Sequence, residues 1–338
     1  MRNFSAVIDY HASDEFGPNI VVSTIGLRAV GTGSVVWAIT TYYNPVRYGR
    51  RLSNYKIFRE NLAAPLVAIE LSFDGKFDLT EGDADILIQV CGGALVWQKE
   101  RLLNLALRAV PADVEHVAWL DCDVILKKDD WALEARKHLQ DQNIVQLFSE
   151  AVFIDPYDYT QRSERNGSAY VPGLLSLSGA KDLISVGSTI EKKVVRYMPG
   201  FAWAAKRSLF TRHGFYDGAI VGSGDSLMAA AMLGQHESIS RRYSFSEARR
   251  RHYFRWALPF NKSVAGRIGY VPGTIFHLKH GEVENRGYVD RQKGLASFDF
   301  DPDIDLRIGQ NGAWDWARPR PDLESFIRKY FMSRAEDG

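Results

Sequence analysis

The sequence predicts an α/β fold in which helices flank a mostly parallel sheet. Three short runs rich in β-forming residues, 35–40, 66–71 and 85–90, alternate with stretches whose apolar residues have helical spacing. Strands of a parallel sheet are buried on both faces, so they read as continuous apolar runs. Ligands of such sheets bind beyond the carboxyl ends of the strands, and functional side chains are expected there.

The remaining elements of the first half have clear boundaries. Apolar residues at helical spacing predict helices over 52–62 and 97–110. A fourth strand, 117–120, runs directly into Asp121-Cys122-Asp123, and the apolar run then resumes at 124–126. The acidic pair therefore lies at the carboxyl end of a buried strand.

The second half is more irregular. We expect a polar loop over 157–173, a basic amphipathic helix over 245–258, a strand over 270–278 and a short helix near 325–332. The basic helix has two interpretations. It could lie on an anionic membrane surface, or it could be a solvated helix whose aromatic residues join the core, which is the favoured interpretation.

The composition is that of an ordinary globular chain of 338 residues, with 46% hydrophobic and 25% charged residues. The formal net charge of +1 gives no argument for a nucleic-acid partner. Cys91 and Cys122 do not make a disulfide framework. No apolar run reaches the roughly 18 residues that span a bilayer, and the first residues lack the apolar stretch of a secretory signal. We therefore expect a cytoplasmic protein, in contact with the inner membrane surface at most peripherally; its oligomeric state is not indicated.

The two aspartates after the fourth strand form a candidate metal site. Carboxylate oxygens are the ligands that Mg²⁺ and Mn²⁺ prefer, and such an ion neutralises the charge of a diphosphate. The alternative is that Asp121 and Asp123 are turn residues that cap the next segment.

Five segments follow one another along the chain. They are WQKERLLN at 97–104, AWLDCDVIL at 118–126, PGFAWAAKR at 199–207, GSGD at 222–225 and HLKHG at 277–281. Together they resemble GT-A glycosyltransferases over about 35–291, in particular inverting families related to β-1,4-galactosyltransferases, polypeptide N-acetylgalactosaminyltransferases and chondroitin-type polymerases. The first segment is similar to the galactosyltransferases' aromatic-Asn-Arg-x-Lys-Leu-Leu-Asn sequence.

The resemblance implies a metal site and a general base. Asp123 matches the direct metal ligand of these families, and Mn²⁺ or Mg²⁺ is the implied ion. His277 and His280 end a strand, where residues three apart face opposite ways, so one of the two is expected to bind the metal. Asp225 is the expected base, although these families carry two or more consecutive acids at this place. Its alternative role is the N-cap of a helix over 226–233.

Further side chains are candidate substrate contacts. Those expected to bind the donor are Thr40, Thr41, Tyr42, Arg47, Glu70, Trp97, Lys99 and Asp121, and those expected to bind the acceptor or sugar are Gly200, Trp203 and Gly224. Most donor candidates end strands, or are basic residues able to pair with phosphate. Trp97 and Lys99 match the families' donor segment. Glycine lets a substrate approach the backbone, whereas Trp203 could stack on a sugar or simply join the core.

The resemblance also implies an organisation of the chain. A GT-A catalytic domain would occupy 35–291, with a nucleotide-binding half at 35–150 and an acceptor-binding half at 151–291. An extension of unknown role would precede it at 1–34, and a tail with a short helix would follow at 292–338.

The implied activity is metal-dependent transfer of a hexosyl or N-acetylhexosaminyl group from a nucleotide-sugar, by default a UDP-sugar. The acceptor would be a hydroxyl of a glycan or glycolipid-type molecule, and the configuration would invert. One alternative is a nucleotidyltransferase of related fold, which would carry a glycine-rich, basic loop where 41–45 stands. The other is a degenerate, carbohydrate-binding protein that kept the fold without turnover.

Overall fold

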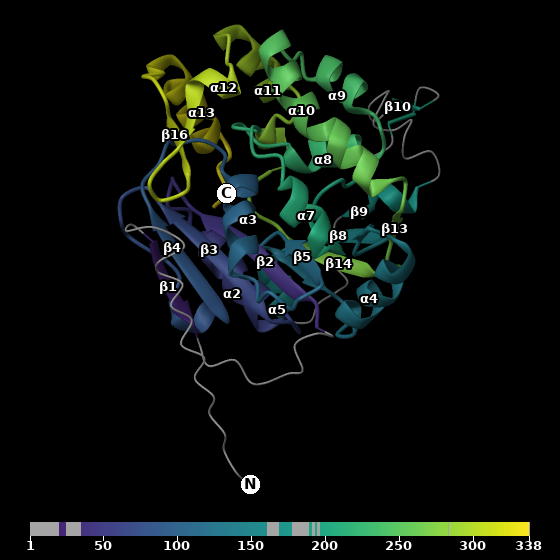
Figure 1. The fold of residues 1–338 in the computed structure, drawn as a ribbon. Coiled ribbons are helices and arrows are strands. Elements are labelled where there is room, and N and C mark those ends of the chain that lie inside the picture. Colours follow the sequence, from purple (N-terminus) through teal and green to yellow (C-terminus); the bar gives the residue numbers. More distant parts are fainter. Residues whose placement is uncertain are drawn as a thin grey trace.

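An eight-stranded sheet forms the centre of the computed structural model, which describes residues 20–24, 35–160, 169–177, 189–190, 193–194, 197–282 and 284–337. Its strand order in this part of the chain is β1-β4-β3-β2-β5-β12-β7-β13 (Figure 1). In that order the strands are Ile20–Thr24, Ile86–Cys91, Leu66–Ser72, Trp37–Tyr43, His116–Leu120, Ala202–Lys206, Ile144–Gln146 and Ile268–Tyr270.

Parallel pairing dominates the first half of this sheet. β4, β3, β2 and β5 are parallel, with Ile39 of β2 opposite Val67 on one side and Trp119 on the other. β12 runs antiparallel between β5 and β7, and β1 runs antiparallel along the outer edge of β4. The predicted α/β fold with a mostly parallel sheet is confirmed.

Helices cover both faces of the sheet (Figure 1). They are α2 Gly49–Glu60, α3 Lys99–Ala109, α4 Trp131–Asp141, α5 Pro156–Thr160, α7 Arg207–His213, α8 Gly224–Met232, α9 His236–Arg242, α10 Glu247–Val264, α11 Asp290–Leu295, α12 Pro302–Asp305 and α13 Pro321–Ser333, with short 3₁₀ turns at Glu81–Asp83, Leu174–Ser176, Glu284–Arg286 and Ala296–Phe298. Two small hairpins pair β10 Thr189–Ile190 with β11 Lys193–Val194 and β15 Leu306–Ile308 with β16 Trp314–Trp316.

Neighbouring residues of the central strands belong to two different cores. In β2, Ile39 packs in the core that contains Leu102 and Leu105 of α3, whereas Ala38 packs in the core that contains Tyr55 of α2. Successive side chains of a strand point to opposite faces, so a strand with helices on both sides is largely apolar along its whole length. This arrangement explains the continuous apolar runs of the sequence.

A second, four-stranded sheet lies beside the first. Its order is β6-β14-β8-β9, from Val124–Leu126, Thr274–Leu278, Glu150–Ile154 and Ala169–Pro172. The predicted single strand over 270–278 is wrong, because the chain leaves the central sheet after Tyr270 and enters the second sheet at Thr274. Pro272 and Gly273 separate the two strands. Of the predicted loop 157–173, residues 161–168 lie outside the described part.

Helix α10 continues past the proline at which the sequence predicts its end. Pro259 lies inside the helix, where it removes a hydrogen bond at a cost of about 3 kcal/mol. Phe260 and Val264 beyond it are fully buried. Their burial, at roughly 1.5–3 kcal/mol for each side chain, outweighs that cost.

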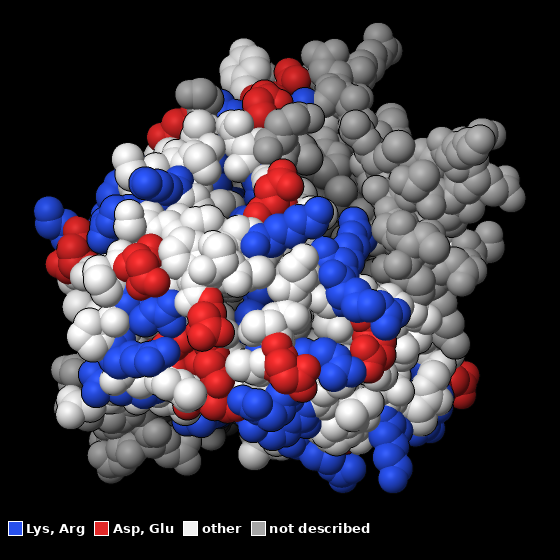
Figure 2. Space-filling view, turned by 90° about the horizontal axis from the view of Figure 1, so that it is seen from above, with Lys and Arg blue, Asp and Glu red and all other residues white. Residues whose placement is uncertain are grey.

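Several basic residues of α10 are paired with acids of neighbouring elements. Arg250 lies 2.5 Å from Glu237, and Arg255 lies 2.5 Å from Asp303. Figure 2, which views the molecule from the side of α10 and α12, shows basic and acidic side chains interleaved on this face. This balance agrees with the solvated interpretation of the helix. In the part of the chain that the structure describes, every helix is too short or too polar to cross a membrane.

The predicted extension and tail both pack against the central fold. From the extension 1–34, residues 20–24 form the edge strand β1, while 1–19 and 25–34 lie outside the described part. In the tail, Phe331 of α13 stacks on Trp97 with their ring centroids 6.2 Å apart. The tail therefore closes over the start of α3, where the chain end lies in Figure 1.

Candidate functional site

The site lies where the direction of strand succession reverses. From β2 the chain proceeds outward through β3 and β4 and then returns to add β5 on the other side of β2. A crevice at such a point, beyond the carboxyl ends of the strands, is the usual ligand site of an open α/β sheet. A cleft of about 920 Å³ occupies this place. The predicted residues that line it are Thr41, Trp97, Lys99, Asp121, Asp123, Gly200, Asp225, His277 and His280.

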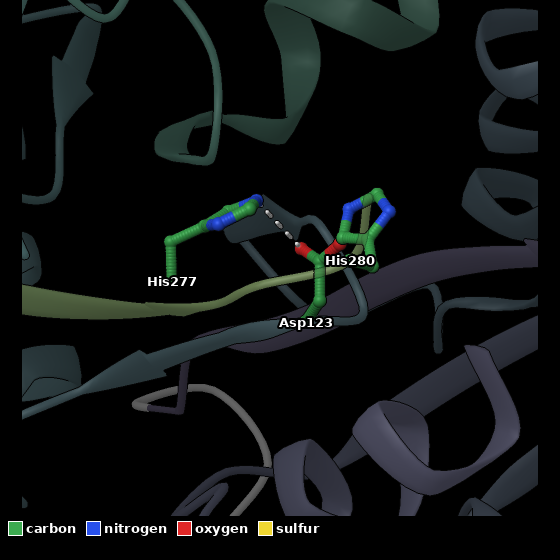
Figure 3. A group of neighbouring side chains, drawn as sticks. All are labelled: Asp123, His277 and His280. Carbon is green, nitrogen blue, oxygen red and sulfur yellow. Dashed lines mark ion pairs between the residues drawn. The ribbon is translucent and has the colours of Figure 1, made fainter. Parts of the chain in front are cut away.

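Asp123, His277 and His280 form a compact group in this cleft. Figure 3 shows the Asp123 carboxylate between the two imidazoles. Its Oδ2 lies 2.8 Å from His280 Nε2, and its Oδ1 lies 3.8 Å from His277 Nε2. One potential ligand atom from each residue lies within 4.8 Å of the other two.

The expectation that His277 and His280 face opposite ways is wrong, whereas the number of histidines that bind a metal stays a prediction. β14 ends at Leu278, so the alternation of a strand stops before His280. The Leu278 amide donates to the Asp123 carbonyl oxygen, which holds the two segments together. Gly281 then takes a left-handed φ of +61°, and the chain turns away with both rings on the Asp123 side.

The charges of this group suit a cation. Burial lowers the pKa of His277 to about 3, so its ring is neutral at physiological pH. Burial opposes ionisation of Asp123, but the two imidazoles and Arg286 outweigh it and hold the pKa of this carboxyl well below its usual range. Asp123 Oδ1 and His277 Nδ1 are buried without a hydrogen-bond partner among the described residues. Carboxylate oxygen and imidazole nitrogen are ligands that suit Mn²⁺ and similar divalent ions.

A second charged group in the cleft consists of Lys99, Asp121 and Asp225. Lys99, in the first turn of α3, places its Nζ 2.5 Å from Asp121 Oδ1 and 3.1 Å from Asp225 Oδ1. Burial opposes the charge of Lys99, but the two aspartates raise its pKa well above the usual value. Burial and the nearby carboxylates of Asp225 and Asp123 raise the pKa of Asp121 to about 6, against the effect of Lys99.

Two predicted glycines make room for these carboxylates. A Cβ on Gly200 would lie 2.8 Å from Asp225 Oδ2, and one on Gly224 would lie 2.0 Å from Oε1 of the buried Glu100. Contacts this short do not occur between real Cβ atoms and oxygen, so both positions need glycine. Gly200 borders the cleft, whereas Gly224 packs against α3 behind it. Asp225 lies in the first turn of α8, and the N-cap position belongs to Ser223.

Four predicted donor residues do not line the cleft. Thr40 is fully buried and donates its hydroxyl to the Leu120 carbonyl, which joins β2 to β5. Tyr42, Arg47 and Glu70 border a separate cavity of about 130 Å³.

The polar groups of that small cavity already have partners. The Glu70 carboxylate accepts hydrogen bonds from the amides of Asp78 and Leu79, so it orders the loop after β3. Arg47 pairs with Asp74 and Asp78, which also accepts from Tyr42. The Arg47 guanidinium, which was expected to contact a phosphate, therefore binds two carboxylates of the protein instead.

Trp203 is placed in the core. It is 1% exposed, and its ring lies parallel to that of Trp119 with centroids 6.1 Å apart. The indole Nε1 donates to the Pro199 carbonyl. The expected sugar contact of Trp203 is therefore corrected to the alternative, a core tryptophan.

The structure adds basic residues that were not among the predicted site residues. Arg286 and Arg291 line the cleft without a carboxylate partner among the described side chains. Arg291 donates to Ser223 Oγ over 3.0 Å, and its buried Nε has no partner. Arg51 and Arg334 also line the cleft and share Glu336. Arg286 and Arg291 follow the histidine segment 277–281 within ten residues, a position that could have drawn attention to them. No sequence signal marks Arg334 or Glu336.

The sequence matches no family model and no curated protein at a significant level. Among solved structures the chain is similar to S. aureus TarS 1-349 in complex with UDP-GlcNAc, at a TM-score of 0.41 and 11% identity over 89% of this chain and 72% of that one. It is also similar to M. tuberculosis glucosyl-3-phosphoglycerate synthase, at 0.39 and 14% over 78% and 80% of the two chains. A third is the catalytic domain of Drosophila β1,4-galactosyltransferase 7 in complex with xylobiose, at 0.36 and 9% over 87% and 99%. TM-scores of this size do not assign a function, which must rest on the residues of the cleft.

Proposed function

We propose that this protein is a metal-dependent glycosyltransferase that moves a sugar from a nucleotide-sugar, with a UDP-sugar as the first donor to test, to an acceptor hydroxyl with inversion. The observation that carries the proposal is the convergence of two groups in one cleft. Asp123, His277 and His280 form a candidate cation site, and the Lys99–Asp225 pair lines the same cleft. This cleft lies where the direction of strand succession in the sheet reverses.

The unpaired basic residues of the cleft support a diphosphate ligand. Arg286 contacts His280, and Arg291 contacts Ser223, so both guanidinium groups lie between the cation site and α8. A guanidinium without a carboxylate partner is suited to the oxygens of a phosphate. Asp123 and the two histidines would hold the divalent cation, which neutralises the charge of the diphosphate as it leaves.

Asp225 is the proposed general base. In a single displacement, a bond forms between the acceptor oxygen and the anomeric carbon while the bond from that carbon to the diphosphate breaks. The acceptor hydroxyl loses its proton to the carboxylate, and the nucleoside diphosphate leaves. Lys99 donates to both Asp225 oxygens, at 3.1 and 3.2 Å, and so holds this carboxylate in place in the cleft.

The nucleotidyltransferase alternative is less well supported by the structure. It requires a phosphate-binding loop or helix start directly after the first central strand. Here the first amides of α2, those of Gly49 and Arg50, donate to the Asp337 carboxylate at 3.0 and 2.9 Å. The helix start that would bind phosphate is therefore occupied by a side chain of the same chain.

Asp225→Asn separates donor binding from chemistry. In wild-type protein a UDP-sugar with Mn²⁺ should raise the melting temperature, because a ligand that binds the native state stabilises it. The variant should keep this shift and lose Mn²⁺-dependent release of UDP by about 100-fold or more, the usual contribution of a general base.

Asp217→Asn is the matched control. Asp217 pairs with Arg101, which like Lys99 belongs to α3, at 3.3 Å, but Asp217 does not line the cleft. It should retain UDP release. Full release by Asp225→Asn would refute the base assignment, and absence of any shift of the wild-type protein across a panel of nucleotide-sugars would refute the proposed donor class.

A further inference from the structure

The turn that leads into α8 has an unusual backbone. Gly222 and Ser223 both have left-handed φ values, +81° and +71°. Serine rarely adopts this conformation, because its Cβ comes too close to the backbone, and such residues persist only where their surroundings fix them. Asp225, the proposed general base, follows in the first turn of α8. Whatever fixes this turn therefore also sets where the Asp225 carboxylate points.

The side chain of Gln292 in α11 holds this turn from behind the cleft. Its Nε2 donates to the Gly222 carbonyl oxygen over 2.7 Å, and its Oε1 accepts from Arg249 Nη2 over 2.8 Å. Gln292 is fully buried and does not line the cleft. A carbonyl oxygen only accepts hydrogen bonds and a guanidinium only donates them, so these two partners fix the orientation of the amide. Its donor side is thereby directed at the turn.

Arg249 of α10 holds Gln292 in this position. The side chain is 3% exposed, and its Cζ lies 4.0 Å from the centroid of the Phe245 ring. In the described part of the chain its guanidinium has no carboxylate partner, and Gln292 accepts its hydrogen bond. A buried charge that lost this acceptor would be costly. The link from Arg249 through Gln292 to Gly222 therefore ties α10 and α11 to the turn.

Two side chains of the cleft hold the same region from the other side. Arg291 Nη2 donates to Ser223 Oγ over 3.0 Å, and a Cβ on Gly222 would lie 3.1 Å from that nitrogen. Lys99 donates to the Asp225 carboxylate from α3. Both Arg291 and Lys99 line the cleft, so neither can be replaced without altering the site itself.

We propose that Gln292 is a positioning residue, which fixes the left-handed turn at Gly222 and Ser223 and so directs Asp225 at the acceptor. The inference rests on the proposed function, in which Asp225 is the general base. Chemical steps are sensitive to the placement of the reacting groups, and a displacement of about 1 Å can cost about 100-fold in rate. Loss of the Gln292 contact should therefore reduce turnover while donor and cation binding are retained.

Gln292→Glu tests this role by replacing the amide NH₂ with oxygen. The carboxylate keeps an acceptor for Arg249 but faces the Gly222 carbonyl without a donor. We expect kcat for Mn²⁺-dependent release of UDP from a UDP-sugar to fall about 10-fold or more, with donor KM and Mn²⁺ affinity within about twofold of wild type. Gln292→Met has a similar length and no charge. It should show the same separation, and it carries the test if Gln292→Glu fails to fold.

Asn261→Asp is the matched control, because it makes the same chemical change at the other end of α8. The Asn261 amide donates to the carbonyl oxygens of Ala231 and Met232, at 2.7 and 3.1 Å, and Asn261 does not line the cleft. Both variants should lose stability, so the assays are run well below their melting temperatures. Asn261→Asp should keep the wild-type kcat. A loss of kcat in this control as large as in Gln292→Glu would reveal a general effect on the fold and overturn the proposal.

A second comparison introduces Gln292→Glu into the Asp225→Asn variant. A residue that acts through Asp225 has no base to position there, so the substitution should cause no further loss of kcat. An equal loss in both backgrounds, or a wild-type kcat in both Gln292 variants, would overturn the proposal.

Hydrogen exchange separates this inference from the proposed function. The amides of 222–228 should exchange faster in Gln292→Glu than in wild type, whereas Asn261→Asp should accelerate those of 230–234. Wild-type rates at 222–228 in Gln292→Glu would overturn the positioning role. If the wild-type protein released no UDP from any UDP-sugar, the proposed function would fail, and these exchange rates would still decide whether Gln292 holds the turn.

Discussion

At the scale of single residues, position at a strand end was the most informative sequence signal. Thr41 lies in the second half of β2, Asp121 and Asp123 follow the end of β5, and all three line the cleft. The same rule also selected Glu70, whose carboxylate is occupied by loop amides. A strand end therefore predicts that a side chain lies near the ligand edge, but its hydrogen-bond partners depend on loops that the sequence does not place.

Glu100 shows how burial beside the cleft affects stability. This carboxyl is 2% exposed and packs against Gly224. Burial raises its pKa to about 8, against the effect of Lys99. In the unfolded chain, where the carboxyl is solvated, its pKa is the ordinary value of 4.5. Between these two values the unfolded chain has lost the proton that the folded protein keeps, so stability falls as pH rises.

We therefore expect Glu100→Gln to gain stability relative to wild type as pH increases. The two free energies of unfolding should be similar near pH 5 and diverge toward pH 9, by up to about 1.4 kcal/mol for each pH unit between the two pKa values. Urea unfolding at a series of pH values measures this difference. Glu134→Gln is the control, because that carboxyl is exposed and pairs with Lys137. Parallel stability curves for wild type and Glu100→Gln would contradict the assigned pKa.

At the scale of elements, the sequence predicted the existence of the central strands and of α3 but not all boundaries. Nearly continuous apolar runs identify strands that are covered on both faces, because a polar residue there needs a buried hydrogen-bond partner. The run 270–278 includes the last residue of β13 and all of β14, which belong to different sheets, and apolar character alone cannot show where one sheet ends. Pro259 is likewise tolerated inside α10 because of buried residues beyond it, which a local rule does not include.

The contact between α3 and α8 depends on the absence of a side chain at Gly224. A Cβ there would meet Oε1, Cδ and Cγ of Glu100, at 2.0, 2.2 and 2.8 Å. We expect Gly224→Ala to lower the free energy of unfolding by about 1–3 kcal/mol, as overpacking does. Glu100→Ala removes all three clashing atoms, so the double variant should recover much of this loss.

A double-mutant cycle, measured by urea unfolding, isolates the coupling between the two positions. Gly82→Ala serves as the control, because nothing lies within 4 Å of a Cβ at that position. A simple sum of the two single effects in the double variant would show that Gly224 is required for another reason.

At the scale of the whole molecule, the feature that the sequence failed to predict is the return of the tail to the cleft. The sequence predicts that the tail 292–338 is an appendage to the catalytic domain. In the structure Arg334 and Ala335 line the cleft, and the Asp337 carboxylate accepts hydrogen bonds from the first amides of α2. Contacts between residues this far apart in the chain leave no periodic signal. The division into a nucleotide-binding and an acceptor-binding half stays a prediction, since β12 of the second half lies between β5 and β7 of the first.

Tyr48 is one of the residues that link the first half of the chain to this tail by hydrogen bonds. Its hydroxyl donates toward the carbonyl oxygens of Phe331 and Met332, at 3.2 and 3.0 Å, and accepts from the Ala335 amide at 3.1 Å. Tyr48→Phe keeps the ring and removes all three contacts. Because three partly exposed backbone groups then each lose a hydrogen bond, we expect a loss of about 1 kcal/mol in the free energy of unfolding.

The location of that loss distinguishes a local link from a general effect on the fold. Hydrogen exchange of Tyr48→Phe should accelerate in 321–337 and stay as in wild type in β2 and β3, because the central sheet keeps its own contacts. Tyr270→Phe of β13 is the control, since its hydroxyl makes no hydrogen bond to a described residue. If exchange in 321–337 were unchanged in Tyr48→Phe, the tail would be held by the packing of Phe331 on Trp97 rather than by this hydroxyl.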